Sequence, residues 1–336
     1  MKGTLVVCDQ IDGRKAAALV VDGRLEDLIV DPVPGTMSLP GTIYRASAGR
    51  PVKGQGGQFV KLPGGASGFL RQGRAPNPGQ PLLVQVTGFA EPGKAVPVSQ
   101  KLLLKGRYVI VTPGAPGVNV SRRIRDDDRR EALTALVTRA CPDAKGVILR
   151  SSADNANDED LTSELTELHE TASRITDQDA GAPELILEGA DAQRVAYLEW
   201  PDVPAGSDGF AECGIDDLVD AAKGPYVDLP GGASAWIEPT RALVAVDVNT
   251  GGDTTPAAGL KANIALCRDL PRQLRCRGLG GQIVIDFAPF PKRDRRTLEQ
   301  VLRAAFKTDT IETALVGWTP LGHFELQRKR ERLPTL

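Results

Sequence analysis

The chain has 336 residues and a formal net charge of −2. Because a domain usually spans about 100–200 residues, this length predicts two or three domains with sizeable cores. The apolar stretches are much shorter than the ~20 residues that cross a bilayer, and no signal peptide opens the chain. We therefore expect a cytoplasmic protein without a membrane-spanning segment.

Cysteine and histidine are too few and too scattered for the common disulfide and metal sites. The five cysteines are odd in number and widely spaced, so they indicate free thiols and neither a disulfide framework nor a zinc knuckle. The two histidines, His169 and His323, exclude a multi-histidine metal site or a histidine-pair nuclease within one chain. Any metal ion must therefore be held by oxygen ligands.

The small net charge hides a strong asymmetry along the chain. Residues 1–150 carry 22 basic and 12 acidic side chains, residues 151–220 carry 2 and 19, and residues 241–336 carry 16 and 10. The two ends of the chain could therefore bind a polyanion, whereas the middle would repel it.

The first hundred residues read as β-structure. Thr4–Asp31 alternates apolar and polar positions around Asp12-Gly13 and Asp22-Gly23, which are turn dipeptides of short antiparallel strands. From Gly41 to about Lys105 the chain is rich in Gly, Pro and Val with short β-prone runs. This composition predicts a small five-stranded barrel, for which we favour an OB-fold.

The middle of the chain mixes helices and strands. Its expected elements, in order, are a strand at Tyr108–Thr112, a Gly/Pro loop, a helix from about Asp126 to Arg139, a strand at Gly146–Arg150 and a helix at Asp160–Ile175. Pro201–Gly209 has the Pro, Gly and Asp content of a linker.

The last third alternates strand and helix, which predicts an α/β or mixed sheet. Its expected elements are a strand at Ala242–Asn249, a helix from about Ala257 to Arg277, a strand at Gln282–Phe287 and a helix at Arg293–Asp309. Pro271 lies inside the first of these helices, at a cost of about 3 kcal/mol unless a kink accommodates it. The hexapeptide Leu-Pro-Gly-Gly-Ala-Ser occurs at Leu62–Ser67 and again at Leu229–Ser234, and we interpret it as a reused hairpin turn.

Two apolar strands end in carboxylates. Alternation places Asp247 and Asn249 on one side of the first strand, and Asp286 ends the second. Magnesium binds one or two carboxylates, keeps several waters and takes its remaining ligands from phosphate oxygens, so such strand ends could hold it. The alternative is that each aspartate only caps a loop.

Five segments of the last hundred or so residues carry a resemblance to a known family: Leu229–Ser234, Thr240–Gly251, Arg272–Arg275, Gly280–Phe287 and Gly322–Leu336. Their sequences are similar to those of the ribonuclease E/G family. In the front half the similar segments are Tyr108–Val111, Ser121–Ile124, Asp127–Arg129 and Gly146–Ser151. The barrel region matches more weakly.

The resemblance implies a role for each candidate residue. It assigns one magnesium ion to Asp247 and Asp286, orientation of the scissile phosphate to Asn249, and recognition of a 5′-monophosphate to Arg150 and Ser151. It implies RNA contacts for a further set: Phe59, Phe69, Lys94, Arg122, Arg123, Arg328 and Arg330. The alternatives are that the two phenylalanines belong to the barrel core and that the arginines form solvated basic faces.

The resemblance also implies a division into parts. These are a reduced RNase H-like part at residues 1–38 with about 185–228, the OB-fold barrel at 39–107, a 5′-sensor-like region at 108–184 and a DNase I-like catalytic domain at 229–336. The expected fold class is α/β in the mixed α+β sense, with the barrel inserted and a mixed α/β catalytic domain at the C-terminal end. The two cysteines that share a zinc ion between subunits in the family are not found, so we expect no zinc and no zinc-linked assembly, and the oligomeric state stays open.

These observations predict a magnesium-dependent endoribonuclease that cuts single-stranded RNA. Attack by an activated water leaves a 5′-phosphate and a 3′-hydroxyl, whereas attack by the ribose 2′-hydroxyl, usually helped by histidine, would leave a cyclic phosphate. The alternative is a non-catalytic RNA-binding protein that keeps the family fold, which the acidic middle of the chain would suit.

Overall fold

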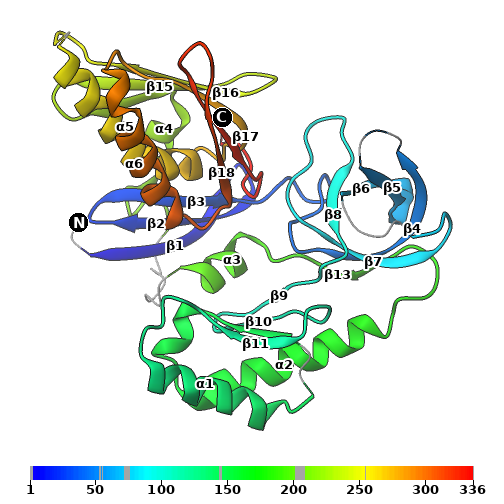
Figure 1. Ribbon diagram of the computed structural model, residues 1–336. Helices are drawn as coiled ribbons and strands as arrows, with labels where there is room; N and C mark the ends of the chain where they lie inside the picture. The colour runs from blue at the N-terminus through cyan, green and yellow to red at the C-terminus, as the bar shows by residue number, and fades with distance from the viewer. Residues whose placement is uncertain are drawn as a thin grey trace. The chain divides into compact units, whose positions relative to one another are not determined.

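The computed structural model describes residues 3–52, 54, 56–71, 76–143, 146–200, 209–253 and 255–335. The chain divides into two compact units, one made of Met1–Val33 with Val203–Leu336 and the other of Pro34–Asp202 (Figure 1). Each unit is described by itself. The predicted linker Pro201–Gly209 lies outside the described residues except for Gly209.

A three-stranded antiparallel meander opens the first unit, as the turn dipeptides predict. Its strands are β1 (Thr4–Ile11), β2 (Arg14–Val21) and β3 (Arg24–Val30). Both residues of each turn have positive φ, 51° and 73° at Asp12-Gly13 and 49° and 78° at Asp22-Gly23, which is the backbone of a type I′ hairpin. The helix α4 (Ile215–Lys223) buries Ile215 and Val219 in the core of this meander.

A mixed six-stranded sheet forms the rest of the first unit. In sheet order its strands are β14 (Tyr226–Leu229), β15 (Ala233–Pro239), β16 (Val244–Asn249), β17 (Gly281–Asp286), β19 (Phe324–Arg328) and β18 (Thr313–Trp318). The pairing of β16 with β17 is parallel, and the others are antiparallel. A parallel pair needs a crossover connection, and here a helix supplies it.

Two amphipathic helices cover one face of this sheet. They are α5 (Pro256–Cys276), which connects β16 to β17, and α6 (Arg295–Lys307), which follows the short helix η3 (Lys292–Asp294) (Figure 1). Leucines of both helices, such as Leu266 and Leu302, pack with Val246 and Ile285 of the sheet in one buried core. On the other face, called the open face below, the central strands expose Asp247, Asn249, Gln282 and Asp286.

The helix α5 has the start and length that its sequence predicts. The Thr255 side chain accepts a hydrogen bond from the Ala258 amide at 3.2 Å, and Pro256 occupies the first turn, where its missing N–H costs nothing. Pro271 lies inside the helix without ending it. Leu270 and Leu274 on either side of the proline are fully buried, so core packing holds the helix together across this position.

The second unit contains the predicted five-stranded barrel. Its strands are β4 (Ile43–Val52), β5 (Gly57–Lys61), β6 (Ser67–Arg71), β7 (Pro81–Val86) and β8 (Val96–Ser99), joined in the order β4-β5-β6-β8-β7. The pairing of β4 with β7 closes the barrel. Strand β13 (Glu184–Leu187) extends the sheet beside β4.

The repeated hexapeptide is a hairpin turn in both places, as predicted. Leu62–Ser67, which includes the short helix η1 (Pro63–Gly65), joins the antiparallel strands β5 and β6, and Leu229–Ser234 joins β14 and β15. Two consecutive glycines have positive φ in each copy, 68° and 84° in the first and 80° and 75° in the second. Positive φ is open to glycine without strain, which explains the reuse.

The rest of the second unit is a four-stranded sheet with helices beside it. The strands, in sheet order, are β11 (Gly117–Val120), β12 (Gly146–Leu149), β10 (Val109–Val111) and β9 (Leu104–Lys105). The helices are η2 (Ser151–Asp154), α1 (Asp127–Ala140), α2 (Asp158–Thr176) and α3 (Ala192–Glu199). The Gly/Pro stretch expected to be only a loop contains β11, because its Val118 and Val120 pack against this core while alternate residues face outward.

The predicted four-part division is finer than these two units and remains a prediction. Within the segment 185–228 expected to accompany residues 1–38, β13 and α3 lie in the second unit, and α4 lies in the first. Cys141, Cys213, Cys267 and Cys276 are free thiols in the structure. Burial raises the pKa of Cys276 to about 12, so this cysteine stays a protonated thiol. None of the helices in the described part of the chain has the length and apolar composition that a membrane crossing requires.

Candidate functional site

The carboxylates of Asp247 and Asp286 are neighbours at the ends of β16 and β17. The two residues are Cα partners in the parallel pairing of these strands, and both are exposed. Neighbouring strands lie about 4.8 Å apart, so both carboxylates can reach one small ligand. They stand on the open face of the sheet, opposite the buried valine and isoleucine positions that face α5 and α6.

Asn249 shares this face, as strand alternation predicts. Its side-chain amide Nδ2 donates a hydrogen bond to Oδ2 of Asp247 at 2.7 Å, which fixes the orientation of that carboxylate. His323, just before β19, brings its Nε2 within 3.8 Å of Oδ1 of Asp286. No pattern along the chain places His323 here, because its distance from Asp286 depends on how β19 pairs with β17.

Two aromatic side chains continue the line of the carboxylates across the sheet. One row of Cα partners crosses four neighbouring strands on the open face: Tyr226, Trp236, Asp247 and Asp286. Tyr226 is 51% exposed and Trp236 is 41% exposed, and their ring centroids lie 5.8 Å apart in an edge-to-face arrangement. Sequence reasoning missed both, although the alternation of β15 indicates which side Trp236 faces.

Phe59 and Phe69 form a cross-strand pair on the outside of the barrel. They are Cα partners in β5 and β6, and their ring centroids lie 5.3 Å apart. Phe59 is 46% exposed and Phe69 is partly buried, whereas their neighbours Val60 and Leu70 fill the barrel core. The alternative that these phenylalanines are core residues is therefore wrong. Lys94, in the connection from β7 to β8, pairs with Glu91 at 2.8 Å. Among the described residues, the cation–π contacts do not include one between Lys94 and either ring.

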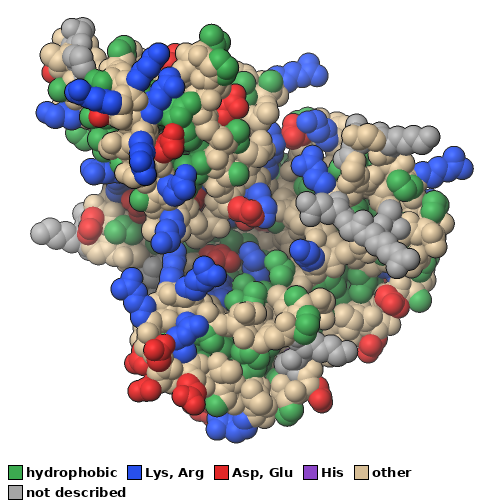
Figure 2. Space-filling view, viewed as in Figure 1, with side chains coloured by type: hydrophobic (Ala, Val, Ile, Leu, Met, Phe, Trp, Pro, Cys, Tyr) green, Lys and Arg blue, Asp and Glu red, His purple; other side chains and the backbone are tan. Residues whose placement is uncertain are grey.

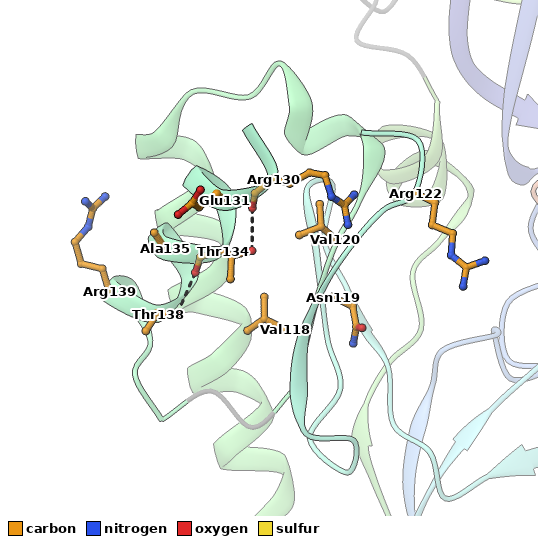
Figure 3. A pocket seen from close by; sticks show the side chains of 10 residues that line it. All are labelled: Val118, Asn119, Val120, Arg122, Arg130, Glu131, Thr134, Ala135, Thr138 and Arg139. Atoms are coloured by element: carbon orange, nitrogen blue, oxygen red, sulfur yellow. Dashed lines mark hydrogen bonds between the residues drawn. The ribbon is translucent and has the colours of Figure 1, made fainter. Parts of the chain in front are cut away.

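Arg122 and Arg123 are both exposed in the turn after β11. Arg122 lines a pocket of about 900 Å³ between β11 and α1, together with Arg130 and Arg139 (Figure 3). Arg130 donates to the backbone carbonyls of Ser121 and Ile124 at 2.9 and 3.0 Å, so its guanidinium holds the turn. Figure 3 shows Arg122 extending away from α1, which leaves its charge directed to the surface.

Arg328 and Arg330 have surroundings that the sequence did not indicate. Arg328 is 1% exposed, and its guanidinium contacts the buried carboxylate of Asp309 and the hydroxyl of Thr313. A side chain so completely buried cannot contact RNA, so the RNA-binding role predicted for Arg328 is wrong. The guanidinium of Arg330 lies against Gly281 and is partly buried.

Exposed basic side chains gather instead on the helices of the first unit, as Figure 2 shows on its visible face. They are Lys261 and Arg268 of α5 and Arg296, Arg303 and Lys307 of α6. These helices pack on the covered face of the sheet, so this charge does not surround the carboxylates of the open face.

The guanidinium of Arg150 forms hydrogen bonds within the protein. Its Nη1 donates to the carbonyls of Gly106 and Leu198 at 2.7 and 2.9 Å, and its Nη2 contacts the Glu199 carboxylate at 2.5 Å. Ser151, which begins η2, is exposed. A phosphate would therefore have to compete with three protein acceptors for this guanidinium.

The similarity to known proteins extends over parts of both units. The model of the "Ribonuclease E/G family" matches residues 103–200 and 202–331. The chain belongs to the ribonuclease E/G family, which confirms the resemblance seen in its sequence.

The similarity to individual relatives is moderate and extends over most of the chain. The chain is 30% identical to ribonuclease G of Salmonella typhimurium over 76% of its own length and 60% of the relative. It is also 30% identical to ribonuclease E of Nostoc sp. over 76% of its own length and 43% of that protein. A match at 29% identity to ribonuclease E of Haemophilus influenzae covers 98% of the chain and 42% of the relative. The chain thus spans about 40–60% of the length of these relatives.

Proposed function

We propose that the chain is a magnesium-dependent endoribonuclease that cuts single-stranded RNA in the cytoplasm, in RNA processing or decay, and leaves 5′-phosphate and 3′-hydroxyl ends. The observation that carries this proposal is the in-register pair Asp247 and Asp286 on the open face of the sheet, in a chain of the ribonuclease E/G family.

The donor set at the two strand ends fits magnesium. Two carboxylates on neighbouring strands, with an amide beside them, leave several positions for water and phosphate oxygens, which is how magnesium is usually held. No group of three or more His, Cys, Asp or Glu side chains able to hold a metal occurs among the described residues, so the proposed site relies on these two carboxylates. When bound, magnesium supplies Lewis-acid activation of the phosphodiester and of water.

The side chains around this pair have separate tasks in the proposal. Asp247 and Asp286 hold the ion, and both face solvent, where a phosphate can approach. Asn249 keeps the Asp247 carboxylate in one orientation through its 2.7 Å hydrogen bond. We assign His323 no proton transfer.

A direct assay tests this function. The purified protein is incubated with a short, 5′-labelled, single-stranded A/U-rich RNA in magnesium or in excess chelator, and the product ends are determined by phosphatase and kinase treatment. We expect cleavage with magnesium only, and products with 5′-phosphate ends. Binding without cleavage would favour the non-catalytic alternative, and cyclic phosphate ends would contradict attack by water.

The aromatic pair of the barrel should bind unpaired bases. A base stacked on an aromatic side chain contributes about 1–3 kcal/mol, so Phe59→Ala should weaken binding of single-stranded RNA by roughly that amount. Fluorescence anisotropy in chelator measures binding apart from cleavage. Leu103→Ala is the matched control, because Leu103 is a 40% exposed apolar side chain of the same unit. An equal loss in both variants would contradict stacking at Phe59.

The environment of Arg150 predicts a weak response to the 5′ end. An arginine–phosphate hydrogen bond is strong, but Glu199 and two carbonyls already occupy this guanidinium. We expect slightly faster cleavage of 5′-monophosphate than of 5′-hydroxyl RNA, and no difference in Arg150→Ala. Glu199→Gln removes the competing charge and should enlarge the difference. Equal rates on both RNAs in the unmodified protein and in Glu199→Gln would show that Arg150 has only a structural role.

A further inference from the structure

Trp236 and Tyr226 are large aromatic side chains left exposed beside the carboxylate pair. We propose that they form a stacking platform for the unpaired bases of RNA next to the phosphate held at Asp247 and Asp286. This inference rests on the proposed function, since it places the bases of that substrate.

The sheet register fixes how near the platform is to the carboxylates. Trp236 is the Cα partner of Asp247, and antiparallel partners have their Cα atoms about 4.5–5.5 Å apart. Tyr226 is the partner of Trp236 and lies one strand further out, on the edge strand β14. A nucleotide whose phosphate reaches Asp247 therefore has the base of a neighbouring nucleotide within reach of the indole.

The charge of this surface favours bases over phosphates. The exposed residues that flank the two rings on β14 and β15 include Asp228 and Glu238, and none of the exposed residues of these two strands is basic. Phosphates would be repelled there, whereas a neutral base can stack on an aromatic face. Stacking needs an unpaired base, because the faces of bases in a duplex are already covered, so the ligand class is single-stranded RNA.

The two rings could also serve only to stabilise the sheet, and the experiment has to distinguish this role from base stacking. Cross-strand aromatic pairs stabilise a sheet, and these rings contact each other edge to face at 5.8 Å. Pairing alone would not require the exposure of 41% and 51% that they keep, or a place in the same row as both carboxylates.

Intrinsic fluorescence tests the platform without any cleavage. Of the three tryptophans, Trp236 is the most exposed, at 41%. Trp200 is 6% exposed, and Trp318 is partly buried among Phe287, Phe290 and Phe324. In chelator, a short oligoadenylate should quench the fluorescence of the unmodified protein, and a duplex of equal length should not. Trp236→Leu should lose this quenching. Quenching that persists in Trp236→Leu would overturn the proposal.

Binding of the variants separates stacking from apolar contact. Trp236→Leu should bind the oligoadenylate roughly 5- to 140-fold more weakly, which corresponds to about 1–3 kcal/mol at 1.4 kcal/mol per factor of ten. Trp236→Phe keeps a ring and should restore most of the affinity. Val316→Ala, which changes a 63% exposed side chain on the opposite edge strand β18, is the control and should bind normally. Denaturation curves of each variant report any loss of stability separately.

An abasic substitution locates the stacked base. In an RNA cut at one position, an abasic nucleotide next to the scissile phosphate should weaken binding to the unmodified protein but not further weaken binding to Trp236→Leu, because the two changes remove the same contact. Additive effects would contradict the proposal.

If the RNA is never cut while it still quenches Trp236, the proposed catalysis fails and the platform stands. If the RNA is cut and Trp236→Leu changes nothing, the platform fails and the catalysis stands.

Discussion

Asp247→Asn and Asp286→Asn should each reduce magnesium-dependent cleavage by at least about 100-fold. Loss of an outer partner of a metal ligand typically costs 10- to 100-fold, and a direct ligand should cost more. Both substitutions keep the size of an exposed side chain, so the fold and the binding of RNA in chelator should be nearly unchanged. Cleavage rates at several magnesium concentrations, with anisotropy for binding, measure both effects.

The control for these variants is Asp228→Asn. Asp228 is exposed on β14 of the same sheet, and its substitution removes the same charge. Asp228 lies outside the row of Cα partners that contains Asp247 and Asp286. Its cleavage rate should stay within a few-fold of the unmodified protein. If Asp228→Asn is as damaging as the other two, the effect is one of general charge and the metal assignment fails, as it also does if both Asp247→Asn and Asp286→Asn cut normally.

Asp309→Ala should destabilise the protein by about 3–5 kcal/mol, which is the usual cost of leaving a buried charge without its partner. The Asp309 side chain is fully buried between Arg275, at 2.7 Å, and the completely buried guanidinium of Arg328. Burial lowers the pKa of Arg328, because removal from water disfavours the charged guanidinium. Chemical denaturation gives the free energy of unfolding.

The neighbouring surface pair provides the comparison. Lys329 and Glu312 are 49% and 73% exposed, so Glu312→Gln should change the free energy of unfolding by less than about 1 kcal/mol. Similar losses in Asp309→Ala and Glu312→Gln would mean that the buried network contributes no more than an exposed one. Because Arg328 lies on β19, which pairs with β17, a destabilised Asp309→Ala should also lose cleavage at lower temperature than the unmodified protein.

The sequence predicted the local features of the candidate site well. The alternation that ends in Asp247 and Asn249, the apolar run that ends in Asp286 and the turn dipeptides of the meander each depend on a few consecutive residues, and the structure has them as expected. The closed barrel was also predicted from short β-prone runs.

The features that escaped prediction depend on residues far apart in the sequence. Trp236 is beside Asp247 only through the register of β15 on β16, and His323 is beside Asp286 only through the position of β19. The burial of Arg328 depends on Asp309 and Thr313, which no spacing in the sequence connects to it. Arg150 matched a phosphate-binding pattern, yet its guanidinium is held by Gly106, Leu198 and Glu199.

Because α5 connects β16 to β17, the carboxylate pair forms later in synthesis and folding than the barrel. The barrel, with its Phe59–Phe69 pair, precedes both carboxylates in the chain, whereas Asp286 meets Asp247 only after α5 and β17 have been made and packed. Chains generally fold domain by domain from the N-terminus as they emerge, and contacts across a long insertion form slowly. On the proposed function, a ribosome-bound chain could hold RNA on its barrel well before it could cut it, so the nascent protein would be harmless to its own messenger until the sheet is complete.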